Sequence, residues 1–470
     1  MKRILTILSL AFLISGCEDQ LDRAPIDSLI NTTAFQSVDD LEAGMVGVYA
    51  NFNPNNVIEF NSIFTDNAKI GFDNGGQQLN LLNQILDSQN NSGGLWSSRY
   101  KTINDANRII EASDLINPNS NEITRYNYVI GQALAFRAYS HYQLLLYYGE
   151  DLLNPGSLGV PYQISVEQDG TPTRLTVGDT KQRIIEDINS AAALIPAGQN
   201  NVNFITADFL TFLRANLELV TGGYDQVINL TSDLISKYPL ATTEEYLGMF
   251  TGDTNTSEVI FSYDNNIAFN RNVANIWIFT GTGGNFVEMG FGLYEALLAD
   301  DSVRLQVNLA QGEGTDVSNN EFGIGKYPEI GGTYINDVKV MRVSEAYLMR
   351  AEAFVRRDQA GGFTNAENDI NSIRVARGSN LGVASFGSLR DAYEEILNER
   401  RLELAFEGTR YIDIKRFRND LNEGLNRDAR DCDGNIPCNI PLNDRRWVFP
   451  IPIVETNANP NIQQNPEWIL

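Results

Sequence analysis

Residues 396–416 read Ile396-Leu-Asn-Glu-Arg-Arg-Leu-Glu-Leu-Ala-Phe-Glu-Gly-Thr-Arg-Tyr-Ile-Asp-Ile-Lys-Arg416. Apolar residues recur in this stretch at helical spacing, and Gly408 is the residue type that ends a helix because it tolerates a positive φ. The stretch therefore predicts a helix, a glycine corner and a second helix. Arg400 and Glu403 lie one turn apart and can pair along the first helix. We expect Arg410 to return toward the acidic helix end and to form a buried ion pair with Glu403 or Glu407.

Two further stretches, 206–239 and 343–378, each predict a helix, a glycine turn and a second helix over about the same length. Their turns contain Gly222 and Gly361, and an aromatic residue follows each turn. A period near ~34 residues with small alanines at the helix contacts is typical of tetratricopeptide helix pairs. These stretches therefore predict a scaffold of repeated helix pairs.

Single helices are predicted upstream of these pairs. Residues 34–49 carry an apolar stripe, and Ser37 with Asp40 has the spacing of a helix-capping pair. Similar stripes predict helices over 104–116, 121–148 and 180–194. The text between them is rich in Asn, Gly and Asp, which is typical of loops.

The N-terminus has the pattern of an exported lipoprotein. Lys2 and Arg3 precede an apolar run over 4–14, which is far shorter than the ~20 residues that span a bilayer. The run ends in Leu-Ile-Ser-Gly before Cys17. We expect 1–16 to be a signal peptide, Cys17 to be lipidated and 17–25 to be a flexible leader; an ordinary secretory peptide with an incidental cysteine is the alternative.

Composition limits the class of ligand. The chain has 470 residues, 43% of them hydrophobic, which is ample for a large core. Its net charge of -25 repels nucleic acid and other polyanions. The composition therefore favours a folded extracellular protein with a neutral ligand and no nucleic-acid partner.

The two remaining cysteines, Cys432 and Cys438, lie six residues apart. An oxidising compartment permits a small loop disulfide between them. The overlapping run Asp-Cys-Asp-Gly-Asn at 431–435 also resembles half of a calcium-binding loop, although the Glu of its twelfth position is missing. A disulfide-closed turn is the favoured interpretation, and a structural calcium ion is the alternative.

The sequence contains no recognisable catalytic motif. The single histidine, His141, lies in the middle of a predicted helix, where we expect a packed or solvated residue. No nucleophile elbow, zinc-protease motif or phosphate-binding loop is present. Two cysteines without a nearby histidine do not make a zinc site. We therefore predict no catalytic residues, no metal site and no cofactor apart from that calcium alternative.

Aromatic clusters suggest a carbohydrate site, because flat rings stack on sugars while polar neighbours bond the hydroxyl groups. Trp96 and Arg99 stand where a loop enters a helix, and Trp277, Phe279 and Phe286 lie within 240–339. We predict these five residues as ligand-binding residues. Ordinary core packing is the alternative for each ring, and it is the favoured interpretation of Tyr100, Trp447 and Trp468.

Ordered blocks relate this chain to a known family. The C-terminal third contains Val-Ser-Glu-Ala-Tyr-Leu-Met-Arg at 343–350, Ile-Asn-Ser-Ile-Arg at 370–374, the corner Glu-Gly-Thr-Arg at 407–410 and Phe-Pro-Ile-Pro at 449–452. With these blocks the chain resembles the SusD/RagB family of outer-membrane nutrient-binding lipoproteins. Upstream agreement around Trp96 extends the resemblance over essentially the whole mature chain.

The resemblance implies a mainly α fold, in which tetratricopeptide-like helix pairs form a right-handed superhelix packed against a loop-rich segment with few short strands. It implies one domain over 26–470. The helical scaffold would occupy 26–239 and 340–420, the loop-rich, ligand-facing insertion 240–339 and a C-terminal segment 421–470.

The same resemblance implies a surface-exposed lipoprotein of the outer membrane, held there by its lipid anchor. Such a protein captures a neutral oligosaccharide or polysaccharide and acts as the lid of a SusC-like TonB-dependent transporter. Only Trp96 with Arg99 has a recognisable position in the family. The ligand-binding role of Trp277, Phe279 and Phe286 is predicted from composition alone. A peptide- or glycopeptide-binding importer subunit is the main alternative, and a surface glycosidase is a weaker one.

Overall fold

The computed structural model describes residues 34–89, 94–166, 170–252, 254, 257–266, 271–280, 284–312, 314–432 and 436–469. The predicted signal peptide, Cys17 and the leader 17–25 lie outside these residues. Within the described ranges, no helix combines the length and the apolar character needed to cross a bilayer.

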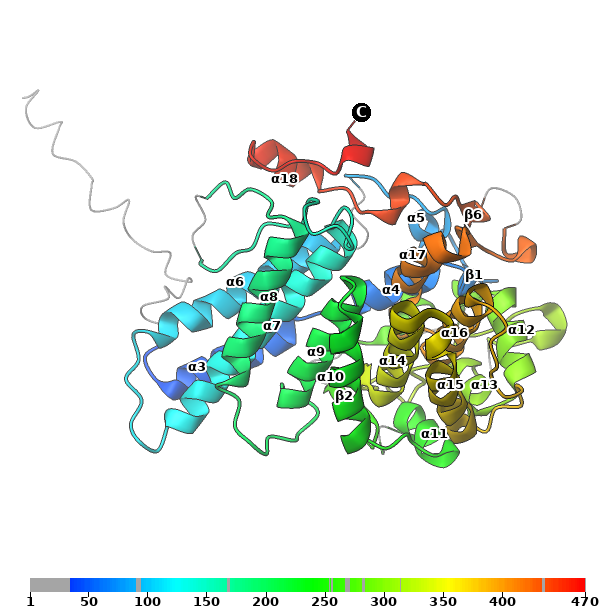
Figure 1. Cartoon of the computed structure of the whole chain (residues 1–470), viewed down its shortest axis with the longest axis horizontal. Helices are drawn as coiled ribbons and strands as arrows, with labels where there is room; N and C mark the ends of the chain where they lie inside the picture. The colour runs from blue at the N-terminus through cyan, green and yellow to red at the C-terminus, as the bar shows by residue number, and fades with distance from the viewer. Residues whose placement is uncertain are drawn as a thin grey trace, which may run out of the picture.

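Helices packed side by side form most of the molecule (Figure 1). In chain order they are α3 (Val38–Asn51), α6 (Leu95–Ser113), α7 (Ile123–Tyr148), α8 (Val177–Ala192), α9 (Ala207–Val220), α10 (Tyr224–Lys237), α14 (Val343–Asp358), α15 (Phe363–Arg377), α16 (Leu389–Glu403) and α17 (Arg410–Leu421), and each packs against the next. The predictions of a mainly α fold and of helix pairs at 206–239, 343–378 and 396–416 are confirmed.

Local sequence signals explain where these helices begin. The Ser37 hydroxyl accepts a hydrogen bond from the backbone N–H of Asp40 at 3.2 Å, and Thr206 caps α9 by accepting from Phe209 N–H at 3.1 Å. Each cap satisfies a donor that the first helical turn leaves free. At the other end of α16, Gly408 adopts a φ of +90° and lets the chain turn into α17.

The insertion 240–339 is only partly loop. It contains α11 (Thr243–Thr251), α12 (Phe291–Asp300) and α13 (Val303–Asn308) as well as β2 (Val259–Tyr263), β3 (Val287–Met289) and β4 (Val338–Arg342). Antiparallel pairing of β2 with β4 brings the two ends of the insertion together. Apolar residues of the insertion join the main core, so packing orders a stretch whose composition alone predicts loops.

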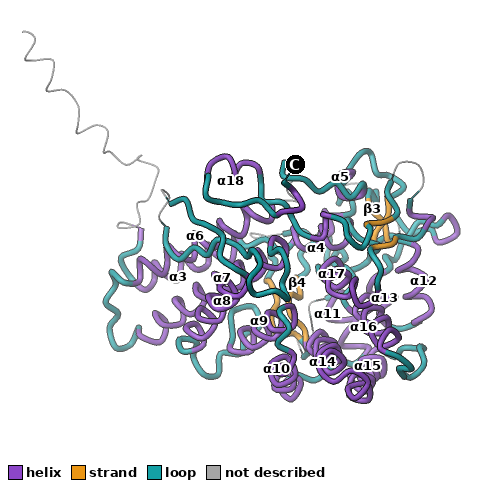
Figure 2. Tube along the Cα trace, turned by 45° about the horizontal axis from the view of Figure 1, so that its top comes forward, coloured by secondary structure: helices purple, strands orange, loops and turns teal. Residues whose placement is uncertain are grey.

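Further short elements complete the described part of the fold. They are α4 (Asn55–Ile63), β1 (Ala68–Ile70), α5 (Leu79–Leu82), β5 (Leu425–Asn426), β6 (Asn439–Ile440) and α18 (Ile453–Ala458). β1 pairs antiparallel with β3, and β5 pairs antiparallel with β6. Figure 2 shows β3 among loops at the end of the molecule opposite α3.

The ion pair predicted for Arg410 is wrong. Its guanidinium donates to both carboxylate oxygens of Asp66, at 2.8 and 2.7 Å, and not to Glu403 or Glu407. Arg410 is the first residue of α17, and it faces the connection between α4 and β1. Burial would raise the pKa of Asp66, but the guanidinium groups of Arg401 and Arg410 outweigh burial and hold this pKa well below its usual range.

Glu403 does not pair with Arg400 either. It is fully buried and pairs with Arg342 and Arg377, both at 2.8 Å, while Arg400 pairs with Asp413 at 2.7 Å. A buried charge requires partners that reach it inside the core, and here they come from the end of β4 and from α15. These pairs cross 61 and 26 residues of sequence, which helical spacing cannot reveal.

Candidate functional site

Three extended segments lie side by side at the edge of the β1–β3 sheet. The chain after β1 continues along β3, because Gly71 N–H donates to Phe286 C=O at 3.1 Å and Asp73 N–H donates to Asn285 C=O at 3.0 Å. On the other side of 284–286, Phe279 N–H donates to Gly284 C=O at 2.9 Å. The stretches that carry Phe72 and Phe279 are therefore bonded to the same central segment.

Phe72 projects from this edge into solvent, with 82% of its surface exposed. Its backbone N–H donates to Glu288 Oε1 at 2.8 Å, and Glu288 is itself buried and paired with Lys69 at 2.5 Å. The turn that follows is closed by Asn74, whose side-chain amide donates to Phe286 C=O at 2.6 Å and to Gln77 C=O at 2.8 Å. The exposed ring thus stands on a turn whose backbone is fixed.

The neighbouring groups suit a ligand rich in hydroxyl groups. Phe279 is half-buried and packs against the ring of Phe286 with centroids 4.8 Å apart. Asp73 and Gln77 are exposed beside Phe72, and Asn275 is exposed on the segment leading to Phe279. An apolar ring with amide and carboxylate groups beside it is the usual composition of a small-molecule site.

A hollow lies at the far end of the same stretch of chain. It has a volume of about 740 Å³ and is lined by 83–87, 443–446 and Glu467. A deeper cavity between α7, α14 and α17 has only about 100 Å³ and is lined by paired charges such as Arg400 and Asp413. The former lies within the ~300–1,000 Å³ typical of ligand pockets, as does a groove of about 590 Å³ lined by residues of α12, α15 and α16. Residues 71–87 therefore join an exposed ring to a polar hollow.

Two family models match this chain. One, described as the SusD family, matches residues 307–468, and the other, described as starch-binding and associating with the outer membrane, matches residues 19–207. The chain belongs to the SusD/RagB family. The SusD-like protein P2 of Formosa agariphila is 24% identical to it, and the alignment covers 99% of both chains.

Solved structures of SusD proteins have the same fold. A SusD superfamily protein of Bacteroides thetaiotaomicron superposes with a TM-score of 0.78 at 22% identity, covering 92% of this chain and all of that one. Surface glycan-binding protein A of the same species, solved with laminarihexaose, gives a TM-score of 0.70 at 17% identity over 92% of this chain and all of that one.

In this SusD/RagB chain, most of the predicted ligand-binding side chains lie in the interior. Trp96 is 3% exposed, Arg99 and Trp277 are fully buried and Phe286 is 5% exposed. A ring that stacks on a sugar must be displayed to solvent, and of the predicted residues only Phe279 keeps a partly exposed ring. The structure brings Phe279 and Phe286 together, while Trp96 and Arg99 lie on α6, in another part of the array.

Packing accounts for each buried ring. Trp96 lies between Tyr100 and Tyr148, with centroids 4.7 and 4.8 Å away, and Trp277 packs against Phe406 at 5.7 Å. Burying such a ring in the core contributes about 1.5–3 kcal/mol more to the stability of the fold than leaving it exposed. A ring with neither face exposed to solvent cannot stack on a sugar, so these residues form part of the scaffold.

Sequence reasoning missed Phe72. Its signal was an aromatic residue within Gly71-Phe72-Asp73-Asn74-Gly75, a polar turn where an apolar side chain has little core to enter. A single exposed apolar side chain is ordinary on a protein surface, so Phe72 is a candidate because its fixed turn, the polar side chains beside it and the stretch that carries Phe279 come together there.

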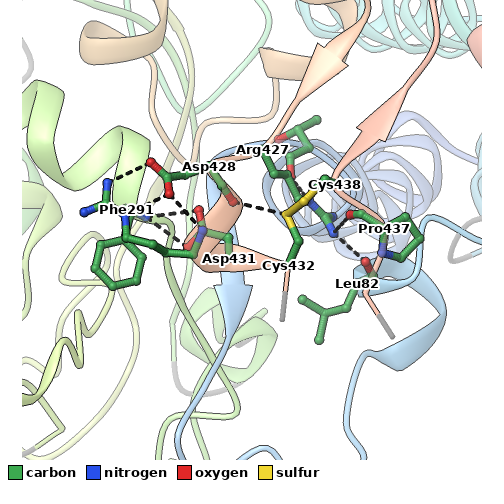
Figure 3. The surroundings of a disulfide bond; sticks show 10 residues. Leu82, Phe291, Arg427, Asp428, Asp431, Cys432, Pro437 and Cys438 are labelled. Carbon is green, nitrogen blue, oxygen red and sulfur yellow. Dashed lines mark hydrogen bonds and ion pairs between the residues drawn. A yellow bond between two sulfur atoms is a disulfide. The ribbon is translucent and has the colours of Figure 1, made fainter. Parts of the chain in front are cut away.

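Cys432 and Cys438 form a disulfide, as predicted (Figure 3). Asp431 beside it accepts a hydrogen bond from Phe291 N–H at 3.1 Å, so its carboxylate caps α12. Burial raises the pKa of Asp431 to about 6. In the described part of the chain, no group of three or more His, Cys, Asp or Glu residues could hold a metal ion. Residues 433–435 of the calcium-like run lie outside that part, and a calcium ion stays a prediction.

Proposed function

We propose that this chain captures neutral oligosaccharides on the surface formed by Phe72 and Phe279 and delivers them to a SusC-like TonB-dependent transporter, for which it acts as the lid. The exposed ring of Phe72 on its fixed turn carries the proposal. The face of an exposed aromatic ring stays in contact with water until a sugar C–H face covers it. Removing this apolar surface from water then favours binding.

The net charge of the chain and its similarity to known proteins support this ligand class. The net charge of -25 disfavours polyanionic ligands. One matching family model is described as starch-binding and associating with the outer membrane, and a protein of the same fold was solved with laminarihexaose. Starch and laminarin, both neutral glucans, are therefore the first probes to use.

In this role the lipid on Cys17 keeps the protein at the outer face of the outer membrane, next to its transporter. Several acyl chains hold a protein firmly, because each buried methylene contributes ~0.8 kcal/mol. Capture and delivery need affinity and motion but no bond-breaking step, so the proposed role requires no catalytic residue.

Replacing Phe72 with Ala tests the proposal. In native gels that contain soluble starch or laminarin, we expect the variant to lose retention at least about tenfold, the size expected for a central aromatic contact. Its melting temperature should stay at the wild-type value because the ring is 82% exposed. A Phe72→Ala/Phe279→Ala double variant should lose any remaining retention.

Phe204→Ala is the matched control. Phe204 is also an exposed phenylalanine, at 39%, but it lies before α9 and packs against Tyr49. It should be retained like the wild type. Wild-type retention of the Phe72 variant would refute the assigned surface, and a wild-type protein that binds peptides but no glycan would favour the peptide-importer alternative.

A further inference from the structure

The buried guanidinium of Arg427 bonds a set of backbone carbonyl groups beneath the Phe72 turn. Nε donates to Thr65 C=O at 2.8 Å, Nη2 to Ile63 C=O at 2.8 Å and Nη1 to Leu82 C=O at 2.5 Å. Arg427 is only 6% exposed, and in the described part of the chain these nitrogens bond carbonyl groups and no carboxylate. Its hydrogen bonds therefore hold main chain, while the carboxylates of Asp66 and Asp431 lie near enough to interact with its charge.

The carbonyl groups it holds lie at both ends of one excursion of the chain. Residues 66–81 leave the core after Thr65, form β1, the Phe72 turn and α5, and return at Leu82. One side chain thus fixes the distance between the start and the end of the segment that displays Phe72. Charge-assisted hydrogen bonds of this kind are roughly twice as strong as neutral ones.

The disulfide segment in turn holds Arg427. Its backbone N–H donates to Cys438 C=O at 2.7 Å, and Nη1 also reaches Pro437 C=O at 3.3 Å. Figure 3 shows Arg427 beside the Cys432–Cys438 bond, with Leu82 and Pro437 on one side and Asp431 bonded to Phe291 on the other. Because Phe291 follows β3, the same segment also fixes the strand that pairs with β1.

We propose that Arg427, held by the Cys432–Cys438 loop, is the positioning residue of the Phe72 turn and thereby sets the affinity of the ligand surface. The positioning of the turn does not depend on the proposed function, whereas the effect on ligand affinity rests on it. Loss of the guanidinium removes the bonds that join the two ends of 66–81. The turn keeps its bonds to 285–288 but opens more often, so its ring and polar neighbours are held together less of the time. A preorganised surface binds more tightly because it does not lose this freedom on binding.

The deciding measurement is amide hydrogen exchange of the purified protein without ligand. In Arg427→Met, the amides of Gly71, Phe72 and Asp73 should exchange at least about tenfold faster than in the wild type, because the segment opens locally. A Cys432→Ser/Cys438→Ser variant should show a smaller increase at the same amides, since it keeps the guanidinium but loosens its support.

Arg174→Met is the matched control. Arg174 is another buried arginine, 8% exposed, that donates to four carbonyl groups, namely those of Tyr148, Leu158, Gly159 and Gln463. None of these partners belongs to 63–82. This variant should lose stability of similar size and should leave exchange at Phe72 unchanged. Equal exchange at Phe72 in the wild type and Arg427→Met, or an equal increase in Arg174→Met, would overturn the positioning role.

Retention in starch and laminarin gels gives the second readout. We expect Arg427→Met to lose retention at least about tenfold while Arg174→Met keeps it. If Arg427→Met frees the turn but is retained like the wild type, the link to affinity is wrong. If Phe72→Ala itself is retained, the proposed function fails while the exchange result still decides the positioning role.

Discussion

At the scale of the residue, His141 couples stability to pH. It is fully buried in α7, where Nδ1 donates to Arg137 C=O at 2.9 Å, Nε2 accepts from Gln163 N–H at 3.1 Å and the ring stacks on Tyr162. These bonds require the neutral ring. Burial lowers the pKa of His141 to about 3, whereas the unfolded chain has its ordinary value near 6.5.

Below about pH 6.5 the unfolded state therefore binds a proton that the folded state does not, and the stability supplied by the neutral ring is lost as the pH falls. One such proton changes the free energy of unfolding by about 1.4 kcal/mol per pH unit. Urea unfolding between about pH 7.5 and pH 5 should show His141→Gln losing less stability with acidification than the wild type, by about 2 kcal/mol in total, because the difference accumulates only below about pH 6.5. Other groups, including Asp431, are common to both proteins and cancel in the comparison. Identical slopes would contradict the prediction.

Contacts of single residues differ in how far the sequence predicts them. The cap at Ser37 and the disulfide at Cys432 were predictable, because each depends on neighbours within six residues. The partner of Arg410 was not, since Asp66 lies 344 residues away. The sequence around an aromatic residue does not tell whether its side chain is buried: Trp277 is buried and Phe72 exposed, although asparagine residues lie close to both.

At the scale of the element, the α16–α17 corner depends on Gly408. Its φ of +90° is strained for any residue with a side chain, and an added Cβ would meet Val57 Cγ1 at 2.9 Å. Gly408→Ala should therefore cost about 1–3 kcal/mol for backbone strain, plus the cost of moving α4. Gly198 has nearly the same φ, +89°, but open space around it. Gly198→Ala should show the strain alone in urea unfolding, and an equal loss in both variants would show that the contact with Val57 is unimportant.

Elements differ in how far sequence predicts them. The long helices carry apolar stripes and caps, so the helix predicted at 121–148 and the observed α7 (Ile123–Tyr148) nearly coincide. The two-residue and three-residue strands have no such signal, because each exists only through its distant partner, as Lys69 pairs with Glu288 across the β1–β3 register. The candidate site lies on the turns and extended segments next to β1 and β3, which explains why its principal ring escaped prediction while the scaffold did not.

At the scale of the whole molecule, the charge of -25 separates neutral from charged ligands. A neutral glucan displaces no counterions when it binds, so its retention should change less than about twofold between 50 and 500 mM NaCl, although screening shortens from roughly 14 to 4 Å over that range. Alginate, a polyanion, should be repelled at the lower concentration. Affinity gels run at both salt concentrations with starch, laminarin and alginate measure this directly. Alginate retention that falls steeply with salt would instead reveal a local cationic surface strong enough to outweigh the net charge, and it would move the ligand class from neutral to acidic glycans.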